Sequence, residues 1–281
     1  MSAVPTVALR DGTILPALGM GTWKMGESRL RLRAEVGALV RGLELGLRVI
    51  DTAEMYADGG AEMVVGEALI GRRDQAFVVS KVLPHNASRR GTVAACERSL
   101  KRMGIEAIDL YLLHWRGSHP LAETLAAFEA LQRAGKIRRW GVSNFDVADL
   151  RELEALASGR ECAANQVYYA LSQRGVEFEL LPWHVRHQVA TMAYCPLDEG
   201  RLIGADPVLG EVARRHGATD AQVALAWLMH KPATIVIPKS GRVAGIEENA
   251  AARGLSLTAA DLAALDEAFP PPKSKRSLAM I

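Results

Sequence analysis

The sequence predicts a closed (β/α)8 barrel, a TIM barrel of the α/β class. Eight short apolar runs occur along the chain, and helical sequence follows each of them. Three of the runs end in Asp51, Lys81 and His114. Because the carboxyl ends of parallel strands share one face of a barrel, we expect these side chains to converge. A doubly wound sheet is the alternative, but no G-x-G-x-x-G motif follows the first run, which counts against a Rossmann half.

The chain begins with a predicted hairpin cap, residues 1–17, in which two short alternating segments flank Asp11-Gly12, a dipeptide typical of type I′ turns. Apolar runs bounded by polar residues then predict buried strands. These lie at residues 18–22, 49–51, 77–81, 110–114, 140–143, 164–167, 191–194 and 235–238. Amphipathic stretches between the strands predict helices. The clearest are residues 31–45, 61–70, 92–103, 121–134, 147–157 and 221–229.

The end of the chain carries extra elements beyond the eight predicted units. Residues 241–252 are expected to form a helix after the last strand, and another helix is expected to start at Leu257-Thr258, where Thr258 and Asp261 resemble a capping box. Residues 270–281 are rich in proline and then apolar. We expect this tail to fold back over the barrel mouth. The whole chain, residues 1–281, is predicted to be a single domain.

Composition narrows the classes of protein that the chain can belong to. It has 281 residues, 49% of them hydrophobic and 23% charged, with a net charge of +2, as in an ordinary soluble globular protein. Its arginine pairs are scattered, which disfavours a nucleic-acid partner. Three cysteines without CxxC spacing indicate neither a disulfide framework nor a metal site. With no signal-peptide pattern and no apolar stretch of about 18 residues, we expect a cytoplasmic monomer without a membrane partner.

Four candidate catalytic residues carry groups suited to proton transfer: Asp51, Tyr56, Lys81 and His114. A phenol is a weak acid, with a pKa near 10, so we expect the ammonium of Lys81 to lower the pKa of Tyr56 by roughly two to three units. Asp51 would keep Lys81 charged, because a buried ammonium without a partner loses its proton. His114 would donate a hydrogen bond to a substrate carbonyl. Each residue alone is more often structural, but the combination favours catalysis.

The stretches that carry these residues resemble the aldo-keto reductase family. They occur in order along the chain, and the resemblance reaches from the hairpin to about residue 270. They are Asp-Thr-Ala-Glu-Met-Tyr at 51–56, Lys81, Ile-Asp-Leu-Tyr-Leu-Leu-His-Trp at 108–115, residues 135–145, Asn-Gln-Val at 165–167 and Ile-Pro-Lys-Ser at 237–240. The segment from Ala53 to Glu62 is most similar to bacterial members that reduce small aldehydes such as methylglyoxal.

The resemblance implies that the four residues form a catalytic tetrad and that NADPH or NADH binds in extended form across the strand ends. Ser143, Asn144 and Gln166 would hold the nicotinamide carboxamide, and Tyr194 would stack on its ring. The full set of implied cofactor contacts is Thr22, Trp23, Ser143, Asn144, Gln166, Tyr194, Pro196, Leu197, Lys239, Ser240, Arg242, Glu248 and Asn249.

Two departures from the family pattern concern the cofactor. The family's usual arginine, six residues after Lys239, is replaced here by Gly245, so either Arg242 reaches the 2′-phosphate instead or the preference for NADPH is weaker. Asp198 and Glu199 occupy the strap over the pyrophosphate, where relatives often carry small residues. Since carboxylates repel a diphosphate, we expect both side chains to point away.

The substrate pocket is expected to be bounded by residues from the loops after the first four strands, with Leu278 and Met280 of the tail as further candidates. The loop residues are Trp23, Met55, His85 and Trp115. Aromatic walls with few polar groups suit a small carbonyl compound. Cys195 has no cationic partner in the pattern and is interpreted as a packing residue.

The sequence therefore predicts an NADPH-dependent reductase of aldehydes and activated ketones, with hydride from the nicotinamide and the proton from Tyr56. Two alternatives remain at this point. One is a barrel lyase or aldolase in which Lys81 forms a Schiff base with the substrate. The other is a sensor that keeps the frame and the cofactor but performs no turnover.

Overall fold

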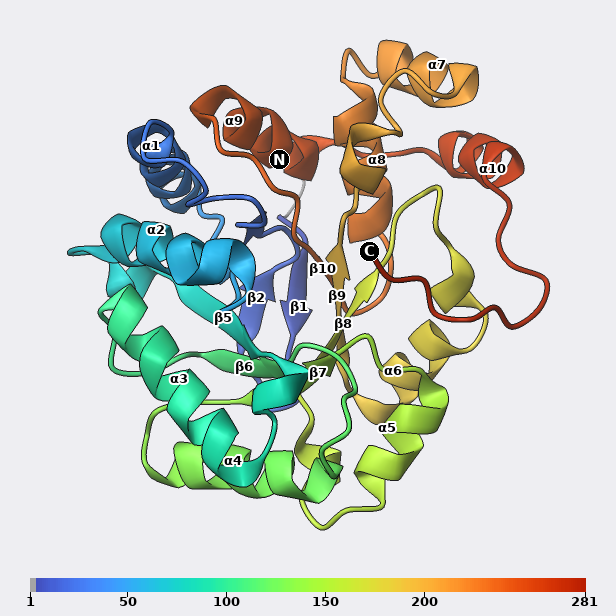
Figure 1. Ribbon diagram of the computed structural model, residues 1–281. Coiled ribbons are helices and arrows are strands. Elements are labelled where there is room, and N and C mark those ends of the chain that lie inside the picture. Colours follow the sequence, from blue (N-terminus) through green and yellow to red (C-terminus); the bar gives the residue numbers. More distant parts are fainter. Residues whose placement is uncertain (1–3) are drawn as a thin grey trace.

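The computed structural model describes residues 4–281 and confirms the predicted TIM barrel (Figure 1). Its eight strands are hydrogen-bonded in sequence order and run parallel. They are β3 (Met20–Gly21), β4 (Val49–Asp51), β5 (Phe77–Val82), β6 (Leu110–Leu113), β7 (Trp140–Ser143), β8 (Ala164–Tyr168), β9 (Ala190–Tyr194) and β10 (Thr234–Val236). The first and last strands meet, because the backbone N–H of Gly19 donates to Val236 O over 2.8 Å and that of Gly21 donates to Pro238 O over 2.9 Å. The barrel is closed.

Helices surround the barrel on the outside, as Figure 1 shows. They are α1 (Leu32–Glu44), α2 (Gly60–Leu69), α3 (Arg89–Met103), α4 (Leu121–Arg133), α5 (Val147–Glu154), α6 (Leu180–His187), α7 (Pro207–Arg215), α8 (Asp220–Met229), α9 (Val243–Ala251) and α10 (Ala259–Ala268). The capping box predicted at Thr258 and Asp261 is present at the start of α10. No residue ranges were predicted for two of the helices, α6 and α7. The second begins with Asp206 as N-cap and Pro207 in the first turn, a start signal that is readable in the sequence.

The predicted hairpin consists of β1 (Thr6–Ala8) and β2 (Ile14–Pro16). Its turn is not type I′, which requires two consecutive left-handed residues. Only Gly12 is left-handed in this turn (φ 85°), and its N–H donates to Leu9 O over 2.9 Å. Asp11 instead accepts a hydrogen bond from the N–H of Thr13 over 3.0 Å and one from Arg139 Nε over 2.6 Å. Because Arg139 precedes β7, the hairpin lies at the end of the barrel where the strands begin.

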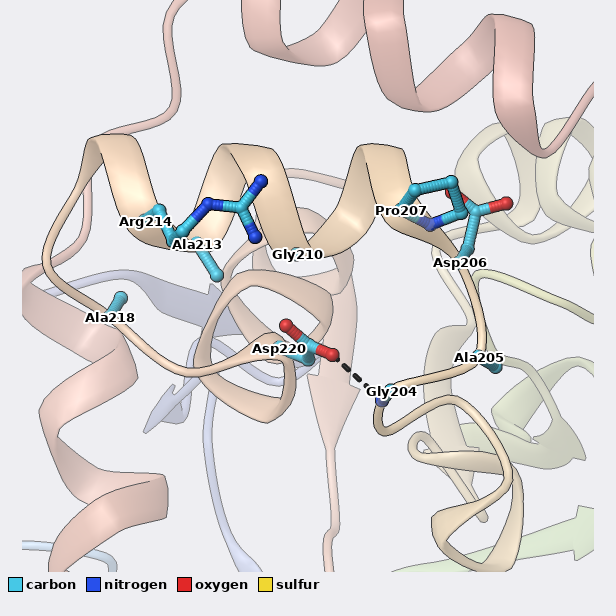
Figure 2. A pocket seen from close by; sticks show the side chains of 9 residues that line it. All are labelled: Gly204, Ala205, Asp206, Pro207, Gly210, Ala213, Arg214, Ala218 and Asp220. Atoms are coloured by element: carbon cyan, nitrogen blue, oxygen red, sulfur yellow. Dashed lines mark hydrogen bonds between the residues drawn. The ribbon is translucent and has the colours of Figure 1, made fainter.

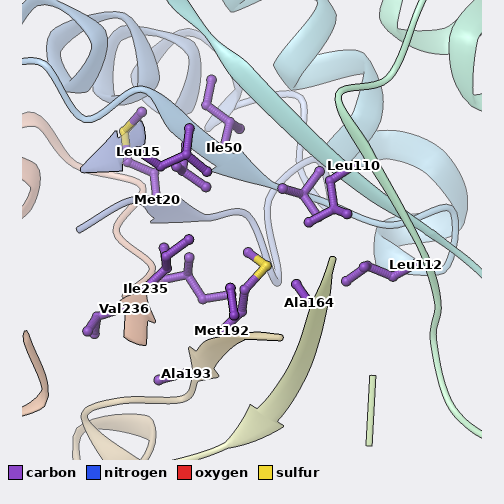
Figure 3. Packing of buried hydrophobic residues seen from close by; sticks show 14 of the residues in the cluster. Leu15, Met20, Ile50, Leu110, Leu112, Ala164, Met192, Ala193, Ile235 and Val236 are labelled. Atoms are coloured by element: carbon purple, nitrogen blue, oxygen red, sulfur yellow. The ribbon is translucent and has the colours of Figure 1, made fainter. Parts of the chain in front are cut away.

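The barrel interior is filled with apolar side chains. Figure 3 shows Leu15 of the hairpin near Met20, Ile50, Ile235 and Met192, which come from four barrel strands. All of these side chains are almost fully buried. A filled interior leaves the loops at the strand ends as the place for a site, as in other barrels of this type.

The tail, residues 270–281, crosses from α10 toward the carboxyl ends of β8 and β9 (Figure 1). Lys275 Nζ lies 3.1 Å from a carboxylate oxygen of Asp146 and 3.1 Å from one of Glu179. Leu278 packs against the core, and Ile281 at the end of the tail is exposed. Within residues 4–281, no helix combines the length and the apolar character needed to span a membrane.

Candidate active site

The structure brings the four candidate catalytic residues together at the carboxyl ends of β4, β5 and β6. Lys81 Nζ donates to Asp51 Oδ2 over 2.8 Å, to the backbone oxygen of Thr52 over 2.9 Å and to the Tyr56 hydroxyl over 3.1 Å. The rings of Tyr56 and His114 meet edge to face, with centroids 5.8 Å apart. An ammonium has three N–H donors, so Lys81 has all of them engaged.

These four side chains lie in a nearly water-free environment. Lys81 has no exposed surface, and the exposed fractions of Asp51, Tyr56 and His114 are 3%, 8% and 7%. Electrostatic interactions are stronger at such a site than in water, since little solvent screens them. The buried ammonium of Lys81 therefore strongly affects whether the Tyr56 oxygen keeps or loses its proton.

The pKa of Tyr56 differs from the sequence-based expectation. Burial, together with the negative charge of Asp51, raises the pKa of Tyr56 well above its ordinary value, so the predicted lowering by Lys81 is wrong. Burial also lowers the pKa of Lys81, and the charge and hydrogen bond of Asp51 oppose that effect. Tyr56 is thus a protonated phenol at neutral pH, whose oxygen accepts a hydrogen bond from the lysine.

His114 is uncharged in this environment. Burial and the nearby charge of Lys81 lower the pKa of its imidazole to about 2. Its backbone is fixed at both ends, because its N–H donates to Val82 O over 3.0 Å and its carbonyl oxygen accepts from Asn144 Nδ2 over 3.2 Å. The ring nitrogen Nδ1 is buried and has no hydrogen-bond partner among residues 4–281. A neutral imidazole offers one N–H donor without a competing positive charge.

The residues expected at the carboxamide end of the cofactor form one connected network beside the tetrad. Gln166 Nε2 donates to Asp51 Oδ1 over 2.7 Å, and Ser143 Oγ donates to the backbone oxygen of Gln166 over 3.0 Å. Asn144 Nδ2 donates to Ser143 Oγ over 3.1 Å, while Asn144 Oδ1 accepts from the Tyr194 hydroxyl over 3.0 Å. Asn144 is left-handed (φ 59°), a conformation that asparagine tolerates better than most residues.

Tyr194 stacks on Tyr168, with ring centroids 5.7 Å apart and an angle of 18° between the planes. One face of the half-buried Tyr194 ring is therefore occupied by protein. In the strap that follows, Pro196 is buried and Leu197 partly buried. Burial raises the pKa of the Cys195 thiol to about 11, which fits a packing role better than that of a nucleophile.

The two strap carboxylates, Asp198 and Glu199, differ in their surroundings. Asp198 accepts hydrogen bonds from Tyr168, from Ser172 Oγ over 3.0 Å and from Arg201 Nη2 over 2.5 Å. Its charge is compensated within the protein. Glu199 is exposed to solvent.

The candidate residues for the adenosine end follow β10. Lys239 pairs with Gly21 in a parallel bridge, which places its backbone at the same end of the barrel as the tetrad. Ser240 and Arg242 are hydrogen-bonded to each other, and both Lys239 and Arg242 are exposed. A Cβ atom at Gly245 would lie 2.3 Å from Ser240 Oγ, so an arginine there would require Ser240 to move.

The last two adenosine candidates lie on α9. Glu248 accepts a hydrogen bond from Thr219 Oγ1 over 2.8 Å, and Asn249 is buried. Thr22 follows Gly21 of β3, the strand that closes the barrel against β10; it is buried and its Oγ1 donates to the backbone oxygen of Asp51 over 3.0 Å. Thr22 thereby supports the tetrad segment.

Three of the four substrate-pocket candidates lie near the tetrad. Trp23 meets Tyr56 edge to face at 4.9 Å and is 39% exposed, and Trp115 lies 4.8 Å from the His114 ring. Met55 is partly buried beside Tyr56. His85 stands apart, because it is exposed in the turn Pro84–Asn86 and makes no hydrogen bond or ring contact with a tetrad residue among those described.

Sequence reasoning missed three charged residues near the site, of which Glu54 and Glu62 are buried and Arg102 is partly buried. Glu54 accepts hydrogen bonds from the backbone N–H of Leu83 and from Asn86 Nδ2, each over 2.9 Å, and so joins the loop of Tyr56 to the loop after β5. Glu62 and Arg102 form an ion pair behind β5. Helix positions alone gave no signal for this pair, since burial depends on how α2 and α3 pack together.

A surface hollow also occurs away from the strand ends, between α7 and the start of α8 (Figure 2). Its lining includes Arg214, Asp206 and Asp220, and Asp220 Oδ2 accepts a hydrogen bond from the N–H of Gly204 over 2.8 Å. Arg214 is exposed and Asp206 caps α7. The hydrogen bonds of Asp220 and Asp206 stabilise the loop and the start of α7, and the hollow shares no residue with the tetrad.

A barrel whose strand ends gather a carboxylate, an ammonium, a phenol and an imidazole defines a class of proton-transferring barrel enzymes. A profile of the Aldo/keto reductase family matches residues 17–269. The chain therefore belongs to the aldo/keto reductase family and is an oxidoreductase, as its sequence predicts.

Individual relatives agree with this assignment. The chain is 51% identical to methylglyoxal reductase YeaE of Escherichia coli, over 95% of each chain. It is 34% identical to glyoxal reductase of Bacillus subtilis, over 93% of this chain and 91% of that protein. A crystal structure of an aldo-keto reductase from Klebsiella pneumoniae in complex with NADPH superposes with a TM-score of 0.97, at 46% identity, covering 99% of this chain and 100% of that chain.

Proposed function

We propose that this protein reduces aldehydes and activated ketones to alcohols with NADPH, and that Tyr56 supplies the proton. The contact of Lys81 Nζ with both Asp51 Oδ2 (2.8 Å) and the Tyr56 hydroxyl (3.1 Å) carries the proposal. An ammonium held against a phenol oxygen stabilises the phenolate that remains after the proton has left.

The residues at the strand ends fit a nicotinamide dinucleotide. The amides of Asn144 and Gln166 supply hydrogen-bond donors and acceptors suited to a carboxamide, and the Tyr194 ring, backed by Tyr168, is a flat surface for an aromatic ring. Lys239 and Arg242 are exposed cations suited to phosphate groups. When bound, NADPH supplies hydride. The relative from Klebsiella pneumoniae is crystallised with this cofactor, which supports the choice.

In the proposed reaction, the substrate carbonyl oxygen accepts hydrogen bonds from the Tyr56 hydroxyl and from the neutral imidazole of His114. The raised pKa of Tyr56 keeps its proton in place until negative charge develops on that oxygen. An alkoxide is a stronger base than a phenolate, so the proton then moves from Tyr56 to the substrate oxygen. Lys81 stabilises the phenolate, and Asp51 keeps Lys81 charged.

The low pKa of His114, about 2, supports the role of a neutral hydrogen-bond donor. A neutral imidazole polarises the carbonyl without competing with Tyr56 as a proton source. The same environment argues against a Schiff base on Lys81, because all three donors of its ammonium are engaged and a nucleophilic amine would have to break those bonds. An assembled tetrad likewise argues against a sensor without turnover.

We propose methylglyoxal and similar small carbonyl compounds as substrates. Trp23 packs against Tyr56 and Trp115 packs against His114, so that the two indole rings supply apolar walls next to the tetrad. The E. coli relative is a methylglyoxal reductase, which supports the same substrate class. We further propose that the chain is a single domain with a hairpin cap and an overlying tail, and that it acts as a cytoplasmic monomer.

Replacing Tyr56 with phenylalanine tests the proposal. The variant should lose turnover with methylglyoxal by a factor on the order of 100 to 10,000, the range for general acid catalysis, while NADPH still quenches protein fluorescence normally. The matched control is Tyr111→Phe, which removes a buried hydroxyl from β6 outside the tetrad and should turn over normally. NADPH oxidation at wild-type rates by Tyr56→Phe would refute the assignment of the proton donor.

A further inference from the structure

An ion pair with a fully buried carboxylate lies directly behind the tetrad, on the helical side of β5. Arg102 on α3 donates from Nε to Glu62 Oε2 on α2 over 2.6 Å and from Nη2 to Ser99 Oγ over 3.3 Å. Glu62 has no exposed surface. Since a buried carboxylate without a partner is strongly unfavourable, each member of the pair holds the other in place.

The pair contacts the strand that carries Lys81. Ser80 Oγ donates to Glu62 Oε1 over 2.6 Å. Neighbouring side chains in a strand point to opposite faces, so Ser80 faces the helices while Lys81 faces the barrel interior. The hydrogen bond from Ser80 therefore fixes β5 at the position immediately before the ammonium-bearing residue.

The pair also contacts the turn that carries Tyr56. After Tyr56, the three residues Ala57, Asp58 and Gly59 are all left-handed, with φ of 51°, 51° and 90°. Residues other than glycine adopt this conformation only when their surroundings enforce it. The Arg102 side chain lies against the α-carbon of Gly59, where an added Cβ would be 2.5 Å from both Cδ and Nε. Arg102 thus blocks one side of the turn.

We infer that Glu62 and Arg102 are positioning residues that hold the Tyr56 hydroxyl at hydrogen-bond distance from the Lys81 ammonium. One rigid pair contacts the turn that carries Tyr56 through Gly59 and the strand that carries Lys81 through Ser80. Loss of the pair frees the left-handed turn to relax and to lengthen the 3.1 Å contact. The inference rests on the reductase function proposed above, because it concerns the geometry of the proton donor.

The variant Arg102→Met tests the inference, since it retains most of the side-chain stem and removes the guanidinium. Its matched control is Arg73→Met. Arg73 Nη2 is paired with the mostly buried carboxylate of Asp109 over 2.6 Å, and Asp109 also accepts a hydrogen bond from the N–H of Val78 on the same strand β5. This second pair lies at the opposite end of the barrel, so the control removes a guanidinium from a mostly buried carboxylate far from the tetrad. Asp109 keeps Arg138 as a second cation, with Nε 3.2 Å from Oδ1.

For Arg102→Met, kcat with methylglyoxal should fall about 100-fold, the cost of a displacement of roughly 1 Å in a reacting group. The KM and the dissociation constant of NADPH should change by less than about threefold, because neither binding site is touched. Arg73→Met should keep the wild-type kcat and lose less stability in urea, because Arg138 still pairs with Asp109. A merely structural role of Arg102 predicts instead that both variants behave alike.

Gly59→Ala is a second variant that should lengthen the contact between the Tyr56 hydroxyl and Lys81 Nζ. It tests the inference if Arg102→Met does not fold. It should show the same loss of kcat with normal NADPH binding. Wild-type kcat in either variant would overturn the inference, and so would an equal loss of kcat in Arg73→Met. If the wild-type protein oxidises no NADPH with any aldehyde, the proposed function fails. If the wild-type protein and both variants are equally active, only the positioning role of Glu62 and Arg102 fails.

Discussion

Gln166 and Asp51 are joined by a hydrogen bond of 2.7 Å from Nε2 to Oδ1, while the other oxygen of Asp51 accepts from Lys81 over 2.8 Å. One buried carboxylate therefore links the proposed carboxamide contact to the proposed proton donor. Both oxygens are satisfied, which allows a charged aspartate to remain buried. The orientation of Lys81 toward Tyr56 depends on this arrangement.

Asp51→Asn should lower kcat about 100-fold, because the buried Lys81 loses the negative charge that holds its proton. Burial lowers the pKa of Lys81 and Asp51 opposes that shift, so removing Asp51 lowers the pKa further. Since the protonated lysine is the active form, the alkaline decline of kcat should move to lower pH. The pH profile of steady-state turnover checks this, and an alkaline decline at the wild-type position would contradict it.

Arg242→Met should weaken NADPH binding by at least about tenfold and leave NADH binding unchanged, since only NADPH carries a 2′-phosphate. Arg242 is exposed beside Ser240, and the space over Gly245 is limited by Ser240 Oγ. Fluorescence titration with both cofactors measures the effect. Arg133→Met, a change on the surface of α4 where Arg133 is 68% exposed, is the control. Equal losses of affinity for NADPH and NADH would show that Arg242 does not bind the 2′-phosphate.

The barrel and the tetrad were predictable because both depend on short-range patterns. Each barrel strand lies where an apolar run predicted it, and parallel strands necessarily place Asp51, Lys81 and His114 on one face. The family resemblance supplied Ser143 and Gln166 as further candidate site residues. These predictions required no distances between residues of different strands.

The parts that the sequence did not predict depend on packing between segments that are distant in the chain. The raised pKa of Tyr56 follows from burial, which no local pattern reports. The contact of Arg102 with Gly59 needs the relative placement of α3 and the Tyr56 turn. The turn of the hairpin differed from type I′ because Asp11 bonds Thr13 and Arg139 instead of adopting a left-handed conformation.

The stability of the protein should fall as the pH decreases from 7 to 5, partly through His184. Burial, helped by the charge of His187, lowers the pKa of His184 to about 3, and its ring nitrogens contact Asn165 and Thr191. The unfolded chain binds a proton near pH 6.5 that the folded state rejects, so this histidine costs roughly 2 kcal/mol of stability at pH 5 relative to pH 7. Urea unfolding of His184→Gln should show a smaller difference between the two pH values. An unchanged difference would refute the assignment.

Lys275→Met should loosen the tail without unfolding the barrel. Lys275 is half exposed, and its two carboxylate partners, Asp146 and Glu179, belong to the segments at the start of α5 and α6. Surface ion pairs contribute little to global stability, so the urea midpoint should stay unchanged. Trypsin should cleave after Arg276 faster than in the wild-type protein, since the tail leaves the surface more often.

Raising the salt concentration should speed cleavage of the wild-type tail toward the variant's rate, because salt screens the same ion pairs. Equal cleavage rates at low salt would show that apolar contacts such as that of Leu278 hold the tail without Lys275.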